Sequence, residues 1–210
     1  VASRNLSFDY VAIKPEHTKN VPIIAKRLPQ LRIIIDHFAK PDIKGKQWQE
    51  WLSPMQEAAQ YPNVFTKFSG LNVLSDWNTW TIEDWRPYLM AMKDAFGSER
   101  IMMGSDWPFS SMANDYETVW KAQLELIKDF PEVERENLTF RAAQRAYNLA
   151  LWSNNILITG KNPDEIIQYP IDKYLENLQD FAMQPQTWGC SEQWRMSQNF
   201  FAVRGIFLKR

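Results

Sequence analysis

The chain has 210 residues, of which 45% are hydrophobic and 23% charged, a composition typical of a soluble globular protein. Its 24 basic and 25 acidic residues leave a net charge of −1, which excludes a broad positive field for nucleic acid or an anionic membrane. No apolar stretch approaches the ~20 residues that span a bilayer, no signal-peptide pattern is present, and the single Cys190 excludes an internal disulfide. We therefore expect a cytoplasmic protein whose partners are small molecules or other proteins.

Four stretches have the pattern of buried strands, and each is followed by a helical pattern. The expected strands lie near residues 7–12, 32–37, 64–69 and 101–105. The expected helical stripes are formed by Val21, Ile24, Ala25 and Leu28; by Trp48, Trp51, Leu52, Met55, Ala58 and Ala59; by Trp85, Leu89, Met92 and Phe96; by Tyr116, Val119, Trp120, Leu124 and Ile127; and by Phe140, Ala143 and Tyr147. This alternation predicts an α/β fold with a parallel sheet, either a barrel or an open doubly wound sheet.

Both architectures place their chemistry at the carboxyl ends of the strands. Here these ends, with the loops that follow them, carry groups suited to acid–base work and substrate contact: Asp36, His37, Lys40, Lys67, Ser69, Ser105, Asp106 and Trp107. Adjacent strand residues face opposite sides, so Asp36 is expected to turn away from His37. Ser69 and Ser105 are interpreted as turn or orienting hydroxyls, because no triad with His17 or His37 is recognisable in the sequence.

Two short motifs follow strand patterns: "DHFAKP", residues 36–41, and "GSDWP", residues 104–108. Together with "FDYVAIKP", "NVFTKFSGL" and "RAYNL" they make residues 3–149 resemble the amidohydrolase-related family. Within it, the chain resembles the lactonases of 2-pyrone-4,6-dicarboxylate and of L-fucono- and L-rhamnonolactones. Family members are (β/α)8 barrels of the TIM type, and the resemblance implies strands five to eight, a half-barrel.

The resemblance also implies roles for individual residues. Asp106 would be the general base that activates water, and His37 would polarise the carbonyl of a small lactone. Lys67 and Lys40 are suited to pair with a substrate carboxylate, and the ring of Trp107 is suited to lie against a substrate ring. A divalent metal such as zinc would be held by Asp106 and His37, although the His-x-His motif of the family's first strand is absent from the sequence.

Other features depart from the family pattern and define the expected domains. Ala142 stands where the family has Asn, and only four strands are visible where a barrel needs about 250 residues. We expect residues 1–150 to form the half-barrel and residues 151–210 to be a C-terminal segment of unassigned role. Either the first half of the barrel is missing from this sequence, which opens on Val1, or a homo-oligomer or completing chain supplies it.

Three functional hypotheses remain open at this point. The first is a lactonase-type hydrolase, which the context of "FSG" and "SDWP" favours. The second is a metal-dependent decarboxylase of the same superfamily. The third is a non-catalytic remnant that binds a protein partner, which the missing His-x-His motif favours for the chain as it stands.

Overall fold

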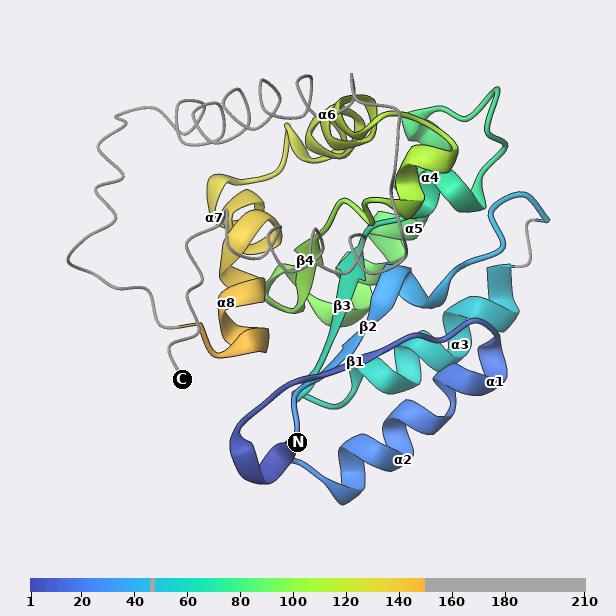
Figure 1. Ribbon diagram of the computed structural model, residues 1–210. Coiled ribbons are helices and arrows are strands. Elements are labelled where there is room, and N and C mark those ends of the chain that lie inside the picture. Colours follow the sequence, from blue (N-terminus) through green and yellow to red (C-terminus); the bar gives the residue numbers. More distant parts are fainter. Residues whose placement is uncertain (46–47, 150–210) are drawn as a thin grey trace, which may run out of the picture. The chain divides into compact units, whose positions relative to one another are not determined.

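The computed structural model describes residues 1–45 and 48–149, so the predicted C-terminal segment 151–210 lies outside the described residues. Its four strands are β1 (Phe8–Tyr10), β2 (Ile33–Ile35), β3 (Val64–Phe68) and β4 (Ile101–Met103), and they form one sheet in the order β1-β2-β3-β4. Every neighbouring pair is parallel, which confirms the predicted topology (Figure 1). All four predicted strands are present, each shorter than its sequence pattern suggested.

Helices follow every strand, as the alternation predicted. They are α1 (Pro15–Thr18) and α2 (Asn20–Arg27) after β1; α3 (Trp48–Ala59) after β2; α4 (Leu71–Leu74) and α5 (Ile82–Phe96) after β3; and α6 (Tyr116–Ile127), α7 (Glu132–Glu136) and α8 (Ala142–Tyr147) after β4. Short 3-10 helices or turns lie at η1 (Ala2–Arg4), η2 (Asp36–Ala39), η3 (Ser98–Arg100) and η4 (Phe109–Met112). Among these described helices, none has the length and apolar character needed to cross a membrane.

The two faces of the sheet are covered by different helices. Ile34, Phe65 and Met102 lie side by side on one face, where they pack against Ala142 and Ala146 of α8. Because side chains alternate along a strand, the residues between them point to the opposite face, on the side of α3 and α5 (Figure 1). The strands are therefore buried on both sides, which explains why their sequences are continuous apolar runs rather than alternating ones.

Most predicted helical stripes are buried, and the exceptions have physical causes. Phe140 is 41% exposed because it lies in a π-helical turn, η5 (Asn137–Arg141), which rotates it off the stripe of α8. Leu28 is 39% exposed because α2 has already ended at the preceding residue. In α6 the polar Gln123 is buried in place of the predicted Leu124, since its amide binds the backbone of the sheet.

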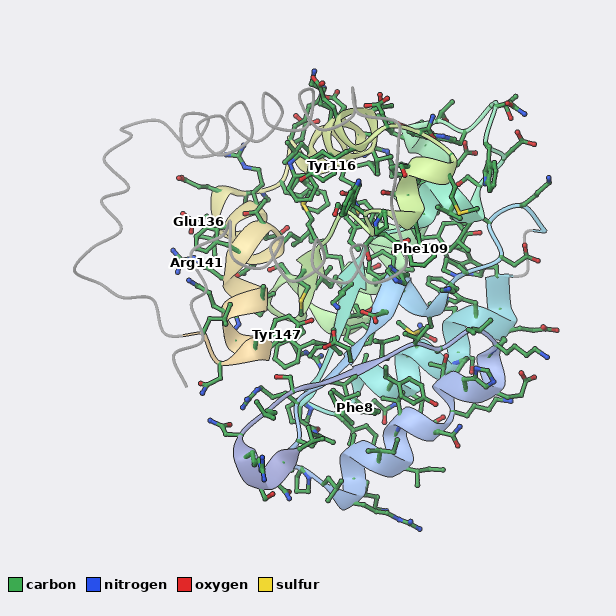
Figure 2. All side chains as sticks on the ribbon, viewed as in Figure 1. Phe8, Phe109, Tyr116, Glu136, Arg141 and Tyr147 are labelled. Carbon is green, nitrogen blue, oxygen red and sulfur yellow. The ribbon has the colours of Figure 1, made fainter. Side chains whose placement is uncertain are left out.

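A charged cluster of Lys67, Asp9, Asp36 and Tyr147, here called the Lys67 cluster, links β1, β3 and α8 with the residue that follows β2. The ammonium of Lys67 lies 2.5 Å from Oδ1 of Asp9 and 2.7 Å from Oδ1 of Asp36. The Tyr147 hydroxyl donates to Asp9 Oδ1 at 2.5 Å, and Figure 2 shows its side chain reaching from α8 toward the strands. Burial lowers the pKa of Lys67, but the other members of the cluster outweigh burial and raise it above the ordinary lysine value.

Replacing Lys67 is expected to destabilise the fold. Lys67→Met leaves two carboxylates without their shared cation, so we expect the free energy of unfolding to fall by about 1–3 kcal/mol in urea denaturation at neutral pH. Because the folded-state pKa of Lys67 is raised, this stabilisation is present below the ordinary lysine pKa and is lost only as the pH rises through the folded value.

Lys121→Met is the matched control for this prediction. Lys121 pairs with Glu117 on the exposed surface of α6, so its loss should leave the free energy of unfolding nearly unchanged. Equal effects of the two substitutions would show that the Lys67 cluster does not contribute more than a surface ion pair.

Candidate active site

Three polar side chains meet where neighbouring parallel strands end. His37 lies two residues after β2, Ser69 directly follows β3, and Asp106 lies three residues after β4. Parallel pairing places the carboxyl ends of these strands at one edge of the sheet. The resemblance implied that His37 and Asp106 act on the same substrate, and the structure brings the two together with Ser69.

The imidazole of His37 lies between the other two groups. Its Nδ1 is 2.7 Å from the Ser69 hydroxyl, and its Nε2 is 3.4 Å from Oδ1 of Asp106. The side chains of His37 and Asp106 are 18% and 17% exposed, whereas Ser69 is 1% exposed. The fold brings the Ser69 hydroxyl to His37, although no triad of the two was recognisable in the sequence. The burial of Ser69 agrees with its predicted role as an orienting hydroxyl.

A left-handed turn aims the His37 side chain. The four consecutive residues His37, Phe38, Ala39 and Lys40 have φ angles of 54°, 50°, 58° and 52°. Each left-handed conformation costs a non-glycine residue about 1–2 kcal/mol, so a run of four needs compensating contacts. Phe38 provides two of them: its ring stacks on Phe68 at 5.5 Å, and its carbonyl accepts a hydrogen bond from Trp51 Nε1 at 2.5 Å.

Gly70 provides the space in which the site closes, and the sequence analysis missed it. Its φ is +68°, and a Cβ at this position would lie 2.6 Å from Oδ2 of Asp106 and 3.2 Å from Nδ1 of His37. Only the absence of a side chain lets both groups come so close to this backbone. A glycine directly after an apolar strand and a serine was the available signal, because such positions often mark a close backbone approach.

Buried amides fix the ends of β3 and β4. The Gln123 side chain donates to the carbonyls of Phe68 and Gly104 at 3.0 and 3.1 Å, and Asn72 donates to the carbonyl of Ser110 at 2.8 Å. These bonds tie α6 to the edge of the sheet and α4 to the turn after β4. Sequence reasoning missed both residues, because a lone Gln or Asn in a helix gives no sign of which backbone group it will meet.

Burial has the largest effect on the pKa values of His37 and Asp106. It lowers the pKa of His37, and the nearby cations of Lys40 and Lys67 act in the same direction, while the Asp106 and Asp36 carboxylates oppose it. Burial likewise raises the pKa of Asp106, and the charge of Asp36 adds to this, whereas His37, Lys40 and Lys67 oppose it. Both shifts favour the uncharged forms, which brings the two proton affinities closer together.

The remaining predicted site residues have different surroundings. Lys40 is partly buried, is close enough to act electrostatically on the pair, and makes no ion pair within residues 1–45 and 48–149. Lys67 is held by the two carboxylates of its cluster, and Asp36 points to Lys67 rather than to His37, as the strand alternation predicted. Trp107 is partly buried beside Asp106, and its amide donates to the Ser105 hydroxyl at 3.3 Å.

The donor set for a metal is incomplete in this part of the chain. His37 Nε2 and Asp106 Oδ1 could act as two ligands, but the described residues contain no group of three or more His, Cys, Asp or Glu side chains placed to hold a metal ion. Stable zinc sites use three or four protein ligands. The residues present therefore do not by themselves fit a zinc centre.

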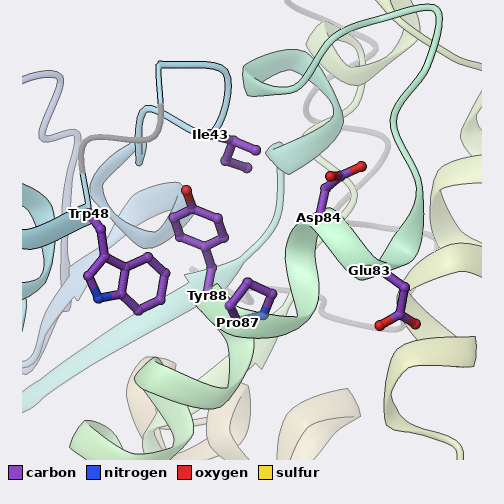
Figure 3. Close-up of a pocket in the computed structure, with 6 residues that line it drawn as sticks. All are labelled: Ile43, Trp48, Glu83, Asp84, Pro87 and Tyr88. Atoms are coloured by element: carbon purple, nitrogen blue, oxygen red, sulfur yellow. The ribbon is translucent and has the colours of Figure 1, made fainter.

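A cavity of about 360 Å³ lies apart from this site, between the loop after η2 and the amino end of α5 (Figure 3). It is lined by Ile43, Trp48, Glu83, Asp84, Pro87 and Tyr88. Its two carboxylates serve the helix: Glu83 pairs with Arg86 at 2.7 Å, and Asp84 accepts the Thr81 amide of the capping box at 2.7 Å. We therefore assign the acids of this cavity to the stability of α5.

Comparison of the chain with known proteins shows the family to which it belongs. The family model described as amidohydrolase matches residues 21–149, which is most of the described chain. The chain belongs to the amidohydrolase family. It is 37% identical over 121 residues to an L-fucono-1,5-lactonase of Burkholderia ambifaria, an alignment that covers 54% of this chain and 39% of the lactonase. The resemblance inferred from the "DHFAKP" and "GSDWP" motifs is thus confirmed.

Solved structures agree on the fold. An amidohydrolase of Burkholderia multivorans with bound zinc is 26% identical and superimposes with a TM-score of 0.64, covering 71% of this chain and 55% of that one. A Pseudomonas putida protein named as a candidate 2-pyrone-4,6-dicarboxylic acid hydrolase is 24% identical, with a TM-score of 0.52 over 64% of this chain and 50% of that one. The chain therefore spans about half the length of these relatives or less.

Filling the space at Gly70 is expected to disrupt the site. Gly70→Ala forces a left-handed alanine and places its Cβ against the Asp106 carboxylate, so we expect a loss of about 2–4 kcal/mol in the free energy of unfolding measured in urea. In an Asp106→Ala background, Gly70→Ala should lower the free energy of unfolding by at least ~1 kcal/mol less, because its Cβ no longer meets the Asp106 carboxylate.

Gly104→Ala is the control for Gly70→Ala. Its Cβ would lie 3.4 Å from that of Ser69, an ordinary contact at the same edge of the sheet, and it should be tolerated better than Gly70→Ala. Identical losses for Gly70→Ala with and without the Asp106 carboxylate would contradict the close approach described here.

Proposed function

We propose that this chain carries half of the active site of a lactonase, an enzyme that hydrolyses the ester bond of a small lactone. The observation that carries the proposal is the approach of His37 Nε2 to Asp106 Oδ1, 3.4 Å apart at the carboxyl edge of a parallel sheet. A carboxylate beside an imidazole supplies a proton acceptor and a hydrogen-bond donor side by side, as lactone hydrolysis requires. The similarity to an L-fucono-1,5-lactonase supports the same reaction class.

In the proposed reaction Asp106 acts as general base. Its carboxylate accepts a proton from a water molecule as the water oxygen forms a bond to the lactone carbonyl carbon. The Nε2–H of His37 donates to the oxyanion that develops, with the cation of Lys40 nearby. When the tetrahedral intermediate collapses, the ring C–O bond breaks and the departing alkoxide takes the proton from Asp106, which yields a hydroxycarboxylic acid.

The charges at the site favour a neutral sugar lactone over a dicarboxylate substrate. The positive charge of Lys67 is already shared between Asp9 and Asp36, so it offers little attraction to a further carboxylate. Lys40 is then the nearby cation that no described carboxylate pairs with, and a dianionic pyrone dicarboxylate would meet more negative than positive charge. Trp107, beside Asp106 in the chain, is proposed to contact the substrate ring.

We further propose that activity requires strands beyond the four described here. Active sites of (β/α)8 barrels draw residues from many of their eight strands, and this sheet supplies four. The other four would come from a longer polypeptide or from a second chain. The reaction class argued above does not depend on a metal-centred step.

The decisive test is hydrolysis of L-fucono-1,5-lactone and of 2-pyrone-4,6-dicarboxylate, followed by acid release. The chain alone should show negligible turnover. The complex obtained by co-expression with the amino-terminal half of the Burkholderia ambifaria lactonase should hydrolyse lactones, and it should prefer the sugar lactone. In that complex Asp106→Asn should lower kcat/KM by about 10²–10⁴-fold. The acid limb of the pH profile should lie above the ordinary aspartate pKa, because activity is lost as Asp106 takes up its proton.

Asp129→Asn, a change at an exposed carboxylate, is the control and should leave turnover unchanged. Turnover by the chain alone would refute the need for further strands. Full activity of Asp106→Asn would remove Asp106 from the proposed mechanism.

Zinc binding by the chain alone is expected to be weak, because two ligands fall short of the three or four of a stable site. Isothermal titration calorimetry should show no saturation at micromolar zinc for the chain or for its His37→Gln variant. Tight stoichiometric binding that His37→Gln abolishes would show that the chain holds a complete metal site.

A further inference from the structure

We propose that Ser69 is a positioning residue that holds His37 as the neutral tautomer with its proton on Nε2, the nitrogen that faces Asp106. This inference rests on the proposed function for its chemical meaning, because Nε2–H is the donor assigned to the developing oxyanion. The tautomer itself is a property of the chain and can be measured without substrate.

The contact between Ser69 and His37 has the geometry of a strong hydrogen bond. Ser69 Oγ lies 2.7 Å from His37 Nδ1, and the serine is 1% exposed, so bulk solvent hardly competes for its hydroxyl. In the part of the chain that the structure describes, the Ser69 hydroxyl makes no other hydrogen bond, so its proton is available for the ring nitrogen. A buried hydroxyl that donates to Nδ1 requires this nitrogen to be unprotonated.

The surroundings of Nε2, on the other side of the His37 ring, favour the same tautomer. Nε2 lies 3.4 Å from the Asp106 carboxylate, and a lone pair on this nitrogen would face a negative charge, whereas an N–H is attracted to it. Gly70 itself carries no side chain that would press against the ring and the carboxylate. Ser69 and Asp106 therefore select the same tautomer from opposite sides of the imidazole.

A nucleophilic role for Ser69 does not fit these contacts. A nucleophile must reach the substrate, and Ser69 is buried behind the His37 ring, on the side away from Asp106. The proton-accepting Nδ1 also has its partner within the protein, while Nε2 is the nitrogen that faces the partly exposed edge. Ser69 acts on the reaction only through His37.

The test is long-range ¹H–¹⁵N correlation NMR of the full chain labelled with ¹⁵N-histidine at a pH where His37 is neutral. The chain has only two histidines, so the signals of His37 can be assigned with a His17→Gln variant. We expect Nδ1 to be unprotonated and Nε2 protonated. Ser69→Ala should shift the tautomer ratio of His37 by about three- to tenfold toward Nδ1–H, the effect of one lost hydrogen bond. Ser69→Thr, which keeps the hydroxyl, should restore the ratio.

The signals of His17 provide an internal control, because its Nδ1 accepts the Ile13 amide and has no contact with Ser69. If Ser69→Thr proves unfolded, Ser69→Cys, with a weaker donor of similar size, should give an intermediate ratio. An Nδ1–H tautomer in the wild-type chain, or an unchanged ratio in folded Ser69→Ala, would overturn the proposal. So would covalent labelling of Ser69 by a fluorophosphonate.

The kinetic consequence separates this inference from the proposed function. In the complex with the completing half, Ser69→Ala should lower kcat by about three- to tenfold with little change in KM, and not by the much larger factor expected of a lost nucleophile. A wild-type complex that hydrolyses no lactone, but whose His37 shows the Nε2–H tautomer, would contradict the proposed function and leave the assignment of Ser69 intact.

Discussion

Strand β3 forms parallel hydrogen-bonded pairs with β2 on one side and β4 on the other, and the whole candidate site depends on this pairing. A one-residue shift in either register would turn side chains to the opposite face of the sheet. It would also move the segments after the strands relative to one another, and His37, Ser69 and Asp106 would no longer meet. The bonds from Gln123 to the carbonyls of Phe68 and Gly104 hold the ends of β3 and β4 in this register.

The same pairing explains how the sheet tolerates charge next to the site. Asp9, Asp36 and Lys67 come from neighbouring strands and point to the same face, so one ammonium can serve two carboxylates. Without Lys67 these carboxylates would add negative charge close to Asp106 and raise its pKa further. A lysine that the sequence suggested as a substrate contact thus has a structural role, and its possible contact with substrate stays a prediction.

The sequence predicted those features that depend on local pattern. Continuous runs such as Ile33–Ile35 identified the strands, and the polar residues that end them identified His37 and Asp106. Features that depend on contacts between distant segments were not predictable. The Ser69–His37 bond and the space at Gly70 exist only because β2, β3 and β4 are adjacent.

Errors in the predicted elements have a similar origin. A π-helical turn inserts an extra residue into the helical repeat, so a stripe counted at regular spacing misplaces Phe140. The apolar stripe expected for α6 did not include Gln123, because its burial depends on carbonyls that only the folded sheet provides. The left-handed turn at residues 37–40 carries no glycine, so the residue types gave no sign of it.

The positions of the site residues along the chain limit where a gene for such a protein can be divided. His37, Ser69 and Asp106 all lie within the contiguous stretch 37–106, together with the β3 strand that organises them. A gene fission, a circular permutation or a recombination crossover outside this stretch keeps the three groups on one polypeptide and leaves their mutual geometry to local folding. A break within it would make their meeting a matter of association between chains, and therefore dependent on protein concentration.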